Sequence, residues 1–147
     1  ISTKTKKKMI LYPGFCITHK RLQAEQVRQA REAHPEAIVL VHPECTPEVI
    51  AQADAVMSTS QMIKYAKESP PQSFLIGTEE GLLHRLKLEN PDKSFYLMCN
   101  ALVCPNMKRT TLDRVLKTME EQRNRIIIPE DIRLKALRTV ERMLAVG

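Results

Sequence analysis

A chain of 147 residues is long enough to close one hydrophobic core and too short for two large ones. Apolar residues make up 43% and charged residues 27%, a balance typical of globular proteins that excludes the disordered, fibrous and coiled-coil classes. The formal net charge of +6 depends largely on a basic leader, residues 1–8, which contains Lys4, Lys6, Lys7 and Lys8.

Membrane and nucleic acid are not expected as partners. No stretch approaches the roughly 18 apolar residues of a membrane span, and no apolar signal region follows the leader. Beyond residue 8, Lys and Arg do not gather into a stripe with stacking aromatic residues. Four cysteines fit free thiols or metal ligands in a reducing compartment better than a disulfide framework. We therefore expect a cytoplasmic protein.

Short apolar runs alternate with amphipathic stretches from Met9 to Met98. This alternation predicts βα units stacked on a short parallel sheet. Two of the runs are continuously apolar, as expected when helices cover both faces in a three-layer αβα sandwich. The expected strands are Met9–Tyr12, Ala37–Val41, Ala55–Met57, Phe74–Ile76 and Ser94–Met98.

The stretches between these runs have helical spacing of apolar residues. Thr46 and Thr78 are expected to start two of the helices, and Pro70-Pro71 and Asn90-Pro91 to end two. The expected stripes are Leu22/Val27/Ala30/Ala33, Val49/Ile50/Ala53, Met62/Ile63/Ala66 and Leu82/Leu83/Leu86.

The pattern changes after Met98. An irregular loop, residues 99–106, is followed by an expected helix from Thr111 to about Gln122, with Thr110 and Asp113 as its capping pair. A last helix is expected over residues 129–145. The chain therefore divides into the leader, an αβα domain over residues 9–109 and a C-terminal helical return segment over residues 110–147.

Reactive side chains follow the expected strands. In an open parallel sheet, the segments that leave the carboxyl ends of the strands share one edge, where ligands bind at helix N-termini. This edge would collect Cys16 and His19 after the first strand, His42-Pro43-Glu44-Cys45 after the second, Ser58-Thr59-Ser60 after the third, Thr78-Glu79 after the fourth, and Cys99 to Cys104 after the fifth.

Each of these residues also has an ordinary structural interpretation. Cys16 could be a small buried hydrophobe, Pro43 could set a turn, and Ser58 could cap a helix. Their shared position at one edge favours a site, because helix caps alone do not require a histidine, an acid and thiols to converge.

The chemistry of such a site can be inferred from the residue types. Hydroxyl groups at a helix N-terminus suit a carboxylate or phosphate, and the pair His42 and Glu44 can move protons near neutral pH. Cys16 and Cys104 could hold a metal centre beside them. The chain has no Cys-x-x-Cys pair, which disfavours structural zinc, and the spacing alone leaves the metal unnamed.

Five motifs, in this order, resemble the quinolinate synthase family, and the resemblance runs from about Tyr12 to Leu144. They are Pro-Gly-Phe-Cys-x-x-His at 13–19, His-Pro-Glu at 42–44, Ser-Thr-Ser at 58–60, Gly-Thr-Glu-x-Gly-x-x-His-Arg-Leu at 77–86 and Cys-Pro-Asn-Met-Lys at 104–108.

The resemblance implies an iron–sulfur transferase of de novo NAD biosynthesis. Such an enzyme condenses iminosuccinate (iminoaspartate) with dihydroxyacetone phosphate to give quinolinate, and it is functionally linked to L-aspartate oxidase. Its 4Fe-4S cluster is held by three cysteines, one from each of three similar αβα domains. By position, Cys16 resembles the second ligand and Cys104 the third, and the fourth iron stays open as a Lewis acid.

The resemblance also assigns the other site residues. His42 and Glu44, with Pro43 between them, match the substrate-binding and acid/base pair. Thr59, together with Ser58, matches the position that binds a carboxylate of iminosuccinate. Cys45 and Cys99 lie outside the ligand pattern and are expected to be structural, although Cys99 could substitute as a ligand.

The family's chains are longer, and their N-terminal half supplies the remaining cysteine and further active-site residues. The chain alone is therefore expected to be inactive, because a cluster needs all its ligands in place. The alternatives are a non-catalytic domain that binds dicarboxylates or other anions without a cluster, and a nucleic-acid adaptor that uses the basic leader.

Overall fold

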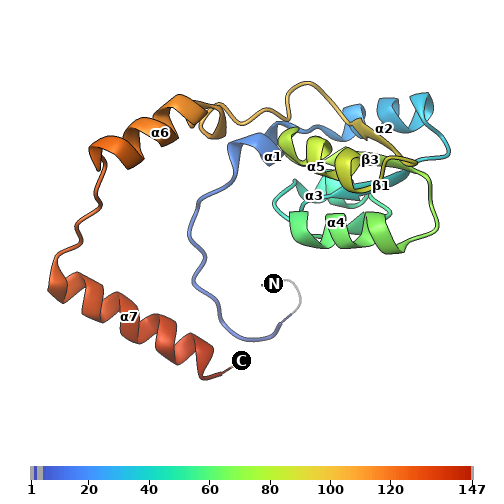
Figure 1. Ribbon diagram of the computed structural model, residues 1–147. Helices are drawn as coiled ribbons and strands as arrows, with labels where there is room; N and C mark the ends of the chain where they lie inside the picture. The colour runs from blue at the N-terminus through green and yellow to red at the C-terminus, as the bar shows by residue number, and fades with distance from the viewer. Residues whose placement is uncertain (1, 3–4, 147) are drawn as a thin grey trace. The chain divides into compact units, whose positions relative to one another are not determined.

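A computed structural model describes residues 2 and 5–146 of the chain (Figure 1). Over these residues the chain forms two compact units, Ile1–Pro105 and Asn106–Gly147, named here the αβα unit and the helical unit. Lys4 of the basic leader lies outside the described residues, and residues 5–16 form neither helix nor strand.

Parallel strands form the centre of the αβα unit. Among the described residues there is one sheet of four strands in the order β2-β1-β3-β4. The register pairs Val41 with both Val56 and Gly77, so β1, β2 and β3 end at the same edge. This carboxyl edge positions the candidate site. The strands are β1 Ile38–Val41, β2 Ala55–Val56, β3 Ser73–Gly77 and β4 Ser94–Leu97.

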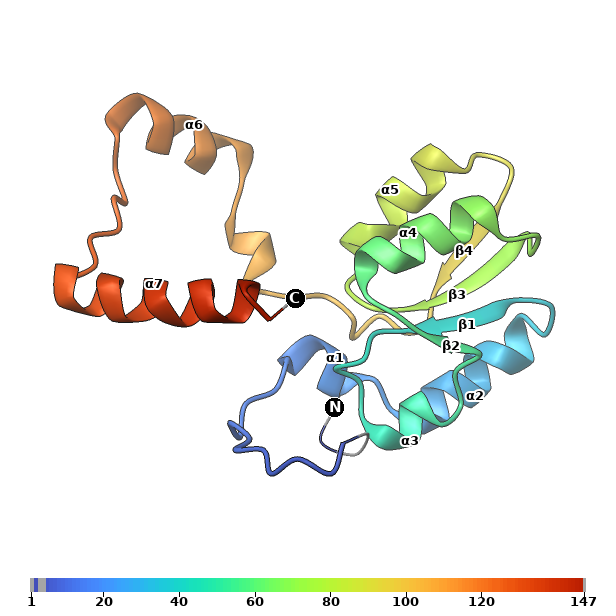
Figure 2. The same cartoon turned by 90° about the horizontal axis from the view of Figure 1, so that it is seen from below.

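Helices cover both faces of this sheet (Figure 2). Because successive side chains of a strand point to opposite faces, Val39 and Val41 enter one buried cluster with Val27 of α2, whereas Leu40 enters another with Met62 of α4. The three-layer αβα class is therefore confirmed. The helices of the unit are α1 Ile17–Arg21, α2 Ala24–Ala33, α3 Pro47–Ile50, α4 Thr59–Glu68 and α5 Gly81–Glu89.

The four predicted strands after Met9–Tyr12 are confirmed, and their ends agree with the predicted ends to within one residue. The predicted strand Met9–Tyr12 is wrong, because this segment is irregular and Ile10 is 97% exposed. The interior strands β1 and β3 each already have two neighbours. A further strand could pair only at an edge of the sheet, with β2 or β4, and residues 9–12 pair with neither.

One predicted helix start and one predicted helix cap are also wrong. The helix predicted to start at Thr78 begins at Gly81, because the Thr78 hydroxyl binds the distant His19 ring instead of capping α5. The helix predicted from Thr111 to about Gln122 spans Leu112–Glu121, and it is capped by Thr111, whose hydroxyl accepts the Arg114 N–H, and not by Thr110.

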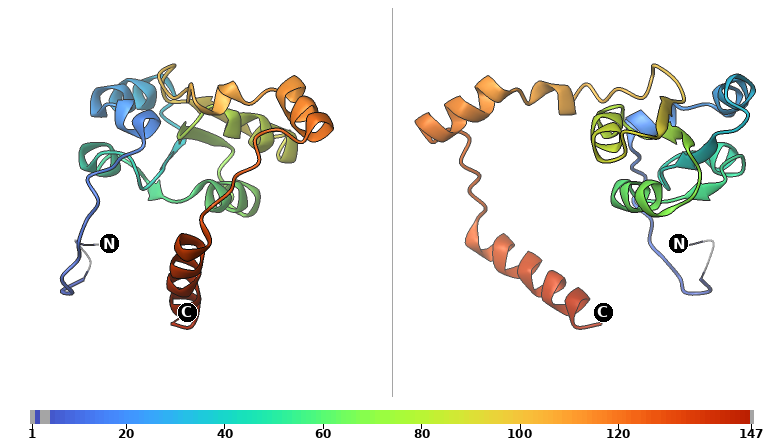
Figure 3. Two further views of the ribbon diagram at one scale, coloured as in Figure 1. Left: turned by 90° about the vertical axis from the view of Figure 1, so that its left-hand side faces the viewer. Right: turned by 45° about the vertical axis from the view of Figure 1, so that its right-hand side comes forward.

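The helical unit contains the 3₁₀ helix η2 (Met107–Arg109), α6 (Leu112–Glu121) and α7 (Glu130–Leu144). An irregular segment, residues 122–129, joins α6 to α7 (Figure 3). Within residues 106–146, every residue is exposed except the half-buried Thr118. The apolar stripes of both helices therefore lack a buried core. Among the described residues, no helix combines the length and apolar character needed to cross a bilayer.

Gly77→Ala is expected to destabilise the αβα unit by about 1–3 kcal/mol, the usual cost of overpacking a filled core. A Cβ at this position would lie 2.9 Å from Val41 Cγ1 and 3.1 Å from Met98 Cε. Urea unfolding followed by circular dichroism measures the change. The matched control is Gly81→Ala at the exposed start of α5. An equal effect of both substitutions would contradict the packing argument.

Candidate active site

Three segments of the αβα unit meet at the carboxyl edge. His42, Pro43 and Glu44 directly follow β1, and Thr78 directly follows β3. The short helix α1 contributes His19, one helical turn after Cys16, which occupies the N-cap position. The sequence interpretation placed all these residues at this edge, and contacts between the three segments connect them.

The imidazole of His19 lies at the centre of these contacts. This residue is only 6% exposed. Its Nδ1 lies 2.9 Å from Glu44 Oε2, and its Nε2 lies 2.9 Å from Thr78 Oγ1. A carboxylate can only accept hydrogen bonds, so Nδ1–H donates to Glu44. In the neutral ring Nε2 then accepts the Thr78 hydroxyl, and the two partners select one tautomer.

His42 stacks on His19 with ring centroids 4.2 Å apart and an interplanar angle of 7°. Its Nδ1 accepts the backbone N–H of Glu44 at 3.3 Å and lies 3.4 Å from Glu44 Oε2. Burial lowers the pKa of His42 below its usual 6.5, neighbouring His19 lowers it further, and the Glu44 carboxylate opposes both. The ring is therefore neutral at pH 7, with its proton on Nε2.

The two predicted thiol ligands, Cys16 and Cys104, lie in segments that are each linked to residues of the carboxyl edge. Cys16 is half-buried, and its sulfur lies within 4.8 Å of the donor atoms of His19 and Glu44. Cys104 is also half-buried, and its backbone N–H donates to Glu79 Oε1 at 3.2 Å. Thus one thiol lies within 4.8 Å of the network, and the segment that carries the other is hydrogen-bonded to the residue after Thr78.

The other two cysteines lie in different surroundings. Cys45 is 6% exposed, and its thiol donates to the Gly77 carbonyl at 3.6 Å. Burial raises the pKa of the Cys45 thiol to about 11. Cys99 is half-buried and lines a cleft of about 420 Å³ with His34, the C-cap residue of α2.

Ser58 and Thr59 occupy the start of α4, beside β1, because the Met57 N–H donates to the Val41 carbonyl at 3.0 Å. The Ser58 hydroxyl accepts the Gln61 N–H, and the Ser58 backbone N–H donates to Gln61 Oε1 at 2.8 Å, forming a capping box; the hydroxyl also donates to Gln61 Oε1 at 2.9 Å. Thr59 is exposed. Among the described residues, the hydrogen bonds that join His19, Glu44 and Thr78 include neither hydroxyl of this pair.

His19 and Thr78 were not among the residues that the sequence interpretation selected for the site. The available signal for His19 was the Cys-x-x-His spacing, which places Cys16 and His19 on one face of a helix. The signal for Thr78 was weaker, because a threonine after an apolar strand is also a common helix cap.

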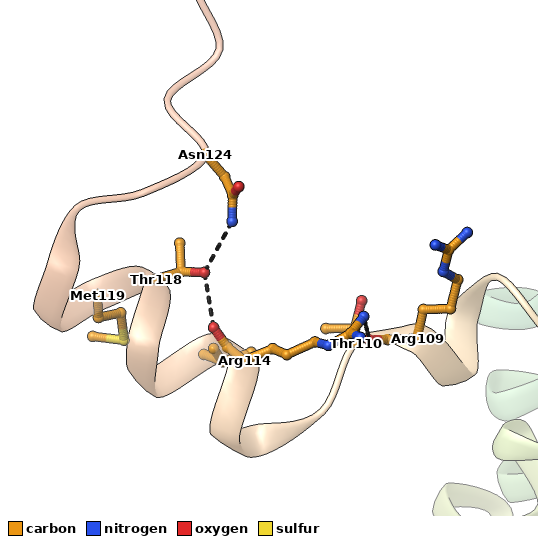
Figure 4. A pocket seen from close by; sticks show the side chains of 7 residues that line it. Arg109, Thr110, Arg114, Thr118, Met119 and Asn124 are labelled. Atoms are coloured by element: carbon orange, nitrogen blue, oxygen red, sulfur yellow. Dashed lines mark hydrogen bonds between the residues drawn. The ribbon is translucent and has the colours of Figure 1, made fainter.

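The helical unit has its own pocket, of about 350 Å³ (Figure 4). Its polar groups bind one another: the Arg114 guanidinium donates to the Arg109 carbonyl, and the Thr118 hydroxyl donates to the Arg114 carbonyl and accepts from Asn124. None of the residues predicted for the site lies in this pocket. Its lining consists of Arg109, Thr110, Arg114, Val115, Thr118, Met119 and Asn124.

The fold and the edge geometry define an α/β domain with a histidine- and thiol-bearing site at the strand ends of a parallel sheet, where such domains bind ligands. The chain belongs to the quinolinate synthetase A protein family, which it matches over residues 1–145. The predicted family resemblance is therefore confirmed.

Similar proteins are identical to this chain at about half of the aligned positions. It is 51% identical over 138 residues to the quinolinate synthase of Thermodesulfovibrio yellowstonii and 51% identical over 140 residues to that of Alkaliphilus metalliredigens. It is 44% identical over 146 residues to the quinolinate synthase of Geobacter metallireducens. These alignments cover 94–99% of the chain and 46–48% of the relatives, so the chain spans about half their length.

Cys45 is expected to be alkylated by iodoacetamide far more slowly than Cys16 at pH 8. The thiolate is the reactive form, and with a pKa of about 11 only about one Cys45 in a thousand carries it at that pH. Peptide mass spectrometry of a time course measures both rates in the same sample. Equal rates would show that the Cys45 thiol is neither shielded nor held protonated.

His42 is expected to titrate below pH 6.5 in the folded chain. Glu44→Gln should lower this pKa further, because the carboxylate is the contribution that raises it. NMR titration of the imidazole signals tests both statements. A rise of the His42 pKa in the variant would contradict the assigned electrostatics.

Proposed function

We propose that this chain is the C-terminal half of a quinolinate synthase, a cytoplasmic transferase that condenses iminosuccinate with dihydroxyacetone phosphate to quinolinate. The observation that carries the proposal is the buried His19 imidazole, which joins Glu44 to Thr78 beside the Cys16 thiol in a chain of this family. L-Aspartate oxidase is the enzyme proposed to supply the iminosuccinate.

The donor set of the edge fits a 4Fe-4S cluster. Cys16 and Cys104 are half-buried thiols at this edge. Burial keeps the Cys45 thiol protonated, so Cys45 does not compete with them as a thiolate ligand. These two cysteines would hold the cluster together with one cysteine from the N-terminal half. When bound, the cluster supplies an open iron that acts as a Lewis acid on a substrate oxygen.

His42 and Glu44 would bind substrate and move protons. The Glu44 side chain is 53% exposed, yet the Nδ1–H of His19 fixes its Oε2, so a solvent-facing carboxylate is held in one orientation. The neutral His42 ring carries its proton on Nε2, which can donate to a substrate oxygen. Glu44 can accept a proton from a substrate bound at the same edge.

Thr59 would bind a carboxylate of iminosuccinate. It begins the ten-residue helix α4, whose first backbone N–H groups and positive dipole end favour an anion. The Ser58 hydroxyl is engaged in the capping box, so Thr59 supplies the available hydroxyl and Ser58 orients the helix start.

The proposed enzyme requires its other half. The chain covers 46% of its relative from Thermodesulfovibrio yellowstonii, and cluster binding would need a third thiolate from the remaining sequence. We therefore expect the chain alone to be inactive and the chain joined to that half to be active.

Cys16→Ala and Cys104→Ala are each expected to abolish quinolinate formation and iron binding in the whole protein, because each removes a cluster ligand. Cys45→Ala is the matched control and should retain both. Iron and sulfide analysis after anaerobic purification, with a quinolinate assay, measures the outcome. Equal loss in all three variants, or carboxylate binding without any iron in the wild type, would contradict the proposal.

A further inference from the structure

The residues directly after β3 bind both thiol-bearing segments. Thr78 is 1% exposed, and its hydroxyl lies 2.9 Å from Nε2 of His19, the residue one turn after Cys16 on α1. The next residue, Glu79, is also buried, at 8% exposure. It contacts the segment that carries Cys104.

The Glu79 carboxylate uses both of its oxygens on backbone groups. Oε2 accepts the Gly81 N–H at 2.7 Å, and Oε1 accepts the Cys104 N–H at 3.2 Å. A parallel bond runs from the Glu80 N–H to the Leu102 carbonyl at 2.9 Å. The loop of residues 99–104, which is neither helix nor strand, is thus attached to the end of β3 at two points.

We infer that Thr78 and Glu79 are positioning residues that together set the separation and orientation of the Cys16 and Cys104 thiols. The inference rests on the proposed function, in which both thiols hold one cluster. Thr78 acts through His19 and α1, and Glu79 acts through the backbone of residue 104. Partners that orient metal ligands commonly change metal affinity about 10–100-fold when they are removed.

Hydrogen-bond chemistry predicts which substitutions break the bond between Thr78 and His19 and the bond between Glu79 and the Cys104 N–H. Glu79→Gln keeps the size of the side chain but replaces one acceptor oxygen with an NH₂ donor, which would face a backbone N–H. One of the two bonds from Gly81 and Cys104 is then lost. Thr78→Val removes the hydroxyl at nearly constant volume, whereas Thr78→Ser keeps it, so the serine variant should rescue the position of His19.

The test uses the chain joined to its N-terminal half, with Glu68→Gln on the exposed face of α4 as a matched carboxylate control. Hydrogen exchange of the peptide covering residues 99–106 reports the hydrogen bond from the Cys104 N–H to Glu79, and this measurement does not need a bound cluster. We expect Glu79→Gln to speed exchange of the Cys104 amide and to lower iron retention during dilution or chelation by about 10-fold or more. Thr78→Val should change the electron paramagnetic resonance spectrum of the reduced cluster, and Thr78→Ser should restore it.

The outcomes separate the inference from the proposed function. If wild type holds the cluster and both Glu79→Gln and Thr78→Val leave exchange, iron retention and spectrum unchanged, the positioning role is wrong. If wild type holds no iron, the proposed function fails instead, even where exchange at Cys104 responds to Glu79→Gln. If the Glu79→Gln variant loses its circular dichroism signal, it has not folded. The comparison of Thr78→Val with Thr78→Ser then decides the role of Thr78.

Discussion

Hydrogen bonds at the end of β3 connect the polar segments of the carboxyl edge. The Gly77 carbonyl accepts the His42 N–H and the Cys45 thiol, and the next two side chains bind His19 and the backbone of Cys104. Because β3 is an interior strand that is buried along nearly its whole length, its end is among the least mobile positions of the unit. Segments attached there gain a defined geometry that irregular loops do not have by themselves.

One carboxylate organises the charge of the site. Glu44 Oε2 lies 2.9 Å from His19 Nδ1 and 3.4 Å from His42 Nδ1, while the two rings stack on each other. Burial disfavours a charge on His42, and the neighbouring His19 lowers the pKa of this ring further, so His42 is neutral near pH 7. Under the proposed function, the exposed side of Glu44 and the Nε2–H of His42 would be the acceptor and the donor for a substrate.

The sequence predicted well those features that depend on local pattern. The continuously apolar run at Ile38–Val41 became a strand buried between two helical layers, and the strand ends brought His42 and Glu44 to one edge. The run Met9–Tyr12 has a similar local pattern but finds no strand partner. Thr78 shows a second limit of prediction from the sequence. Its hydroxyl could cap a helix or bind a distant imidazole, and only the tertiary structure shows which of the two occurs. The importance of His19 likewise depends on residues 25 and 59 positions away, which no local spacing reveals.

Under the proposed function, the exposed apolar stripes of α6 and α7 and the need for a third cluster thiolate have the same physical explanation. Thr111 caps α6 and apolar stripes run along α6 and α7, so local signals suffice to define these helices, yet helices of this length take most of their stability from a packed apolar face. The candidate cluster site likewise has two suitable thiols, because the third nearby cysteine, Cys45, donates to Gly77 and stays protonated. An apolar surface for the helices and a further thiolate for the metal are both contributions that additional protein can make, and the relatives contain about twice the sequence of this chain.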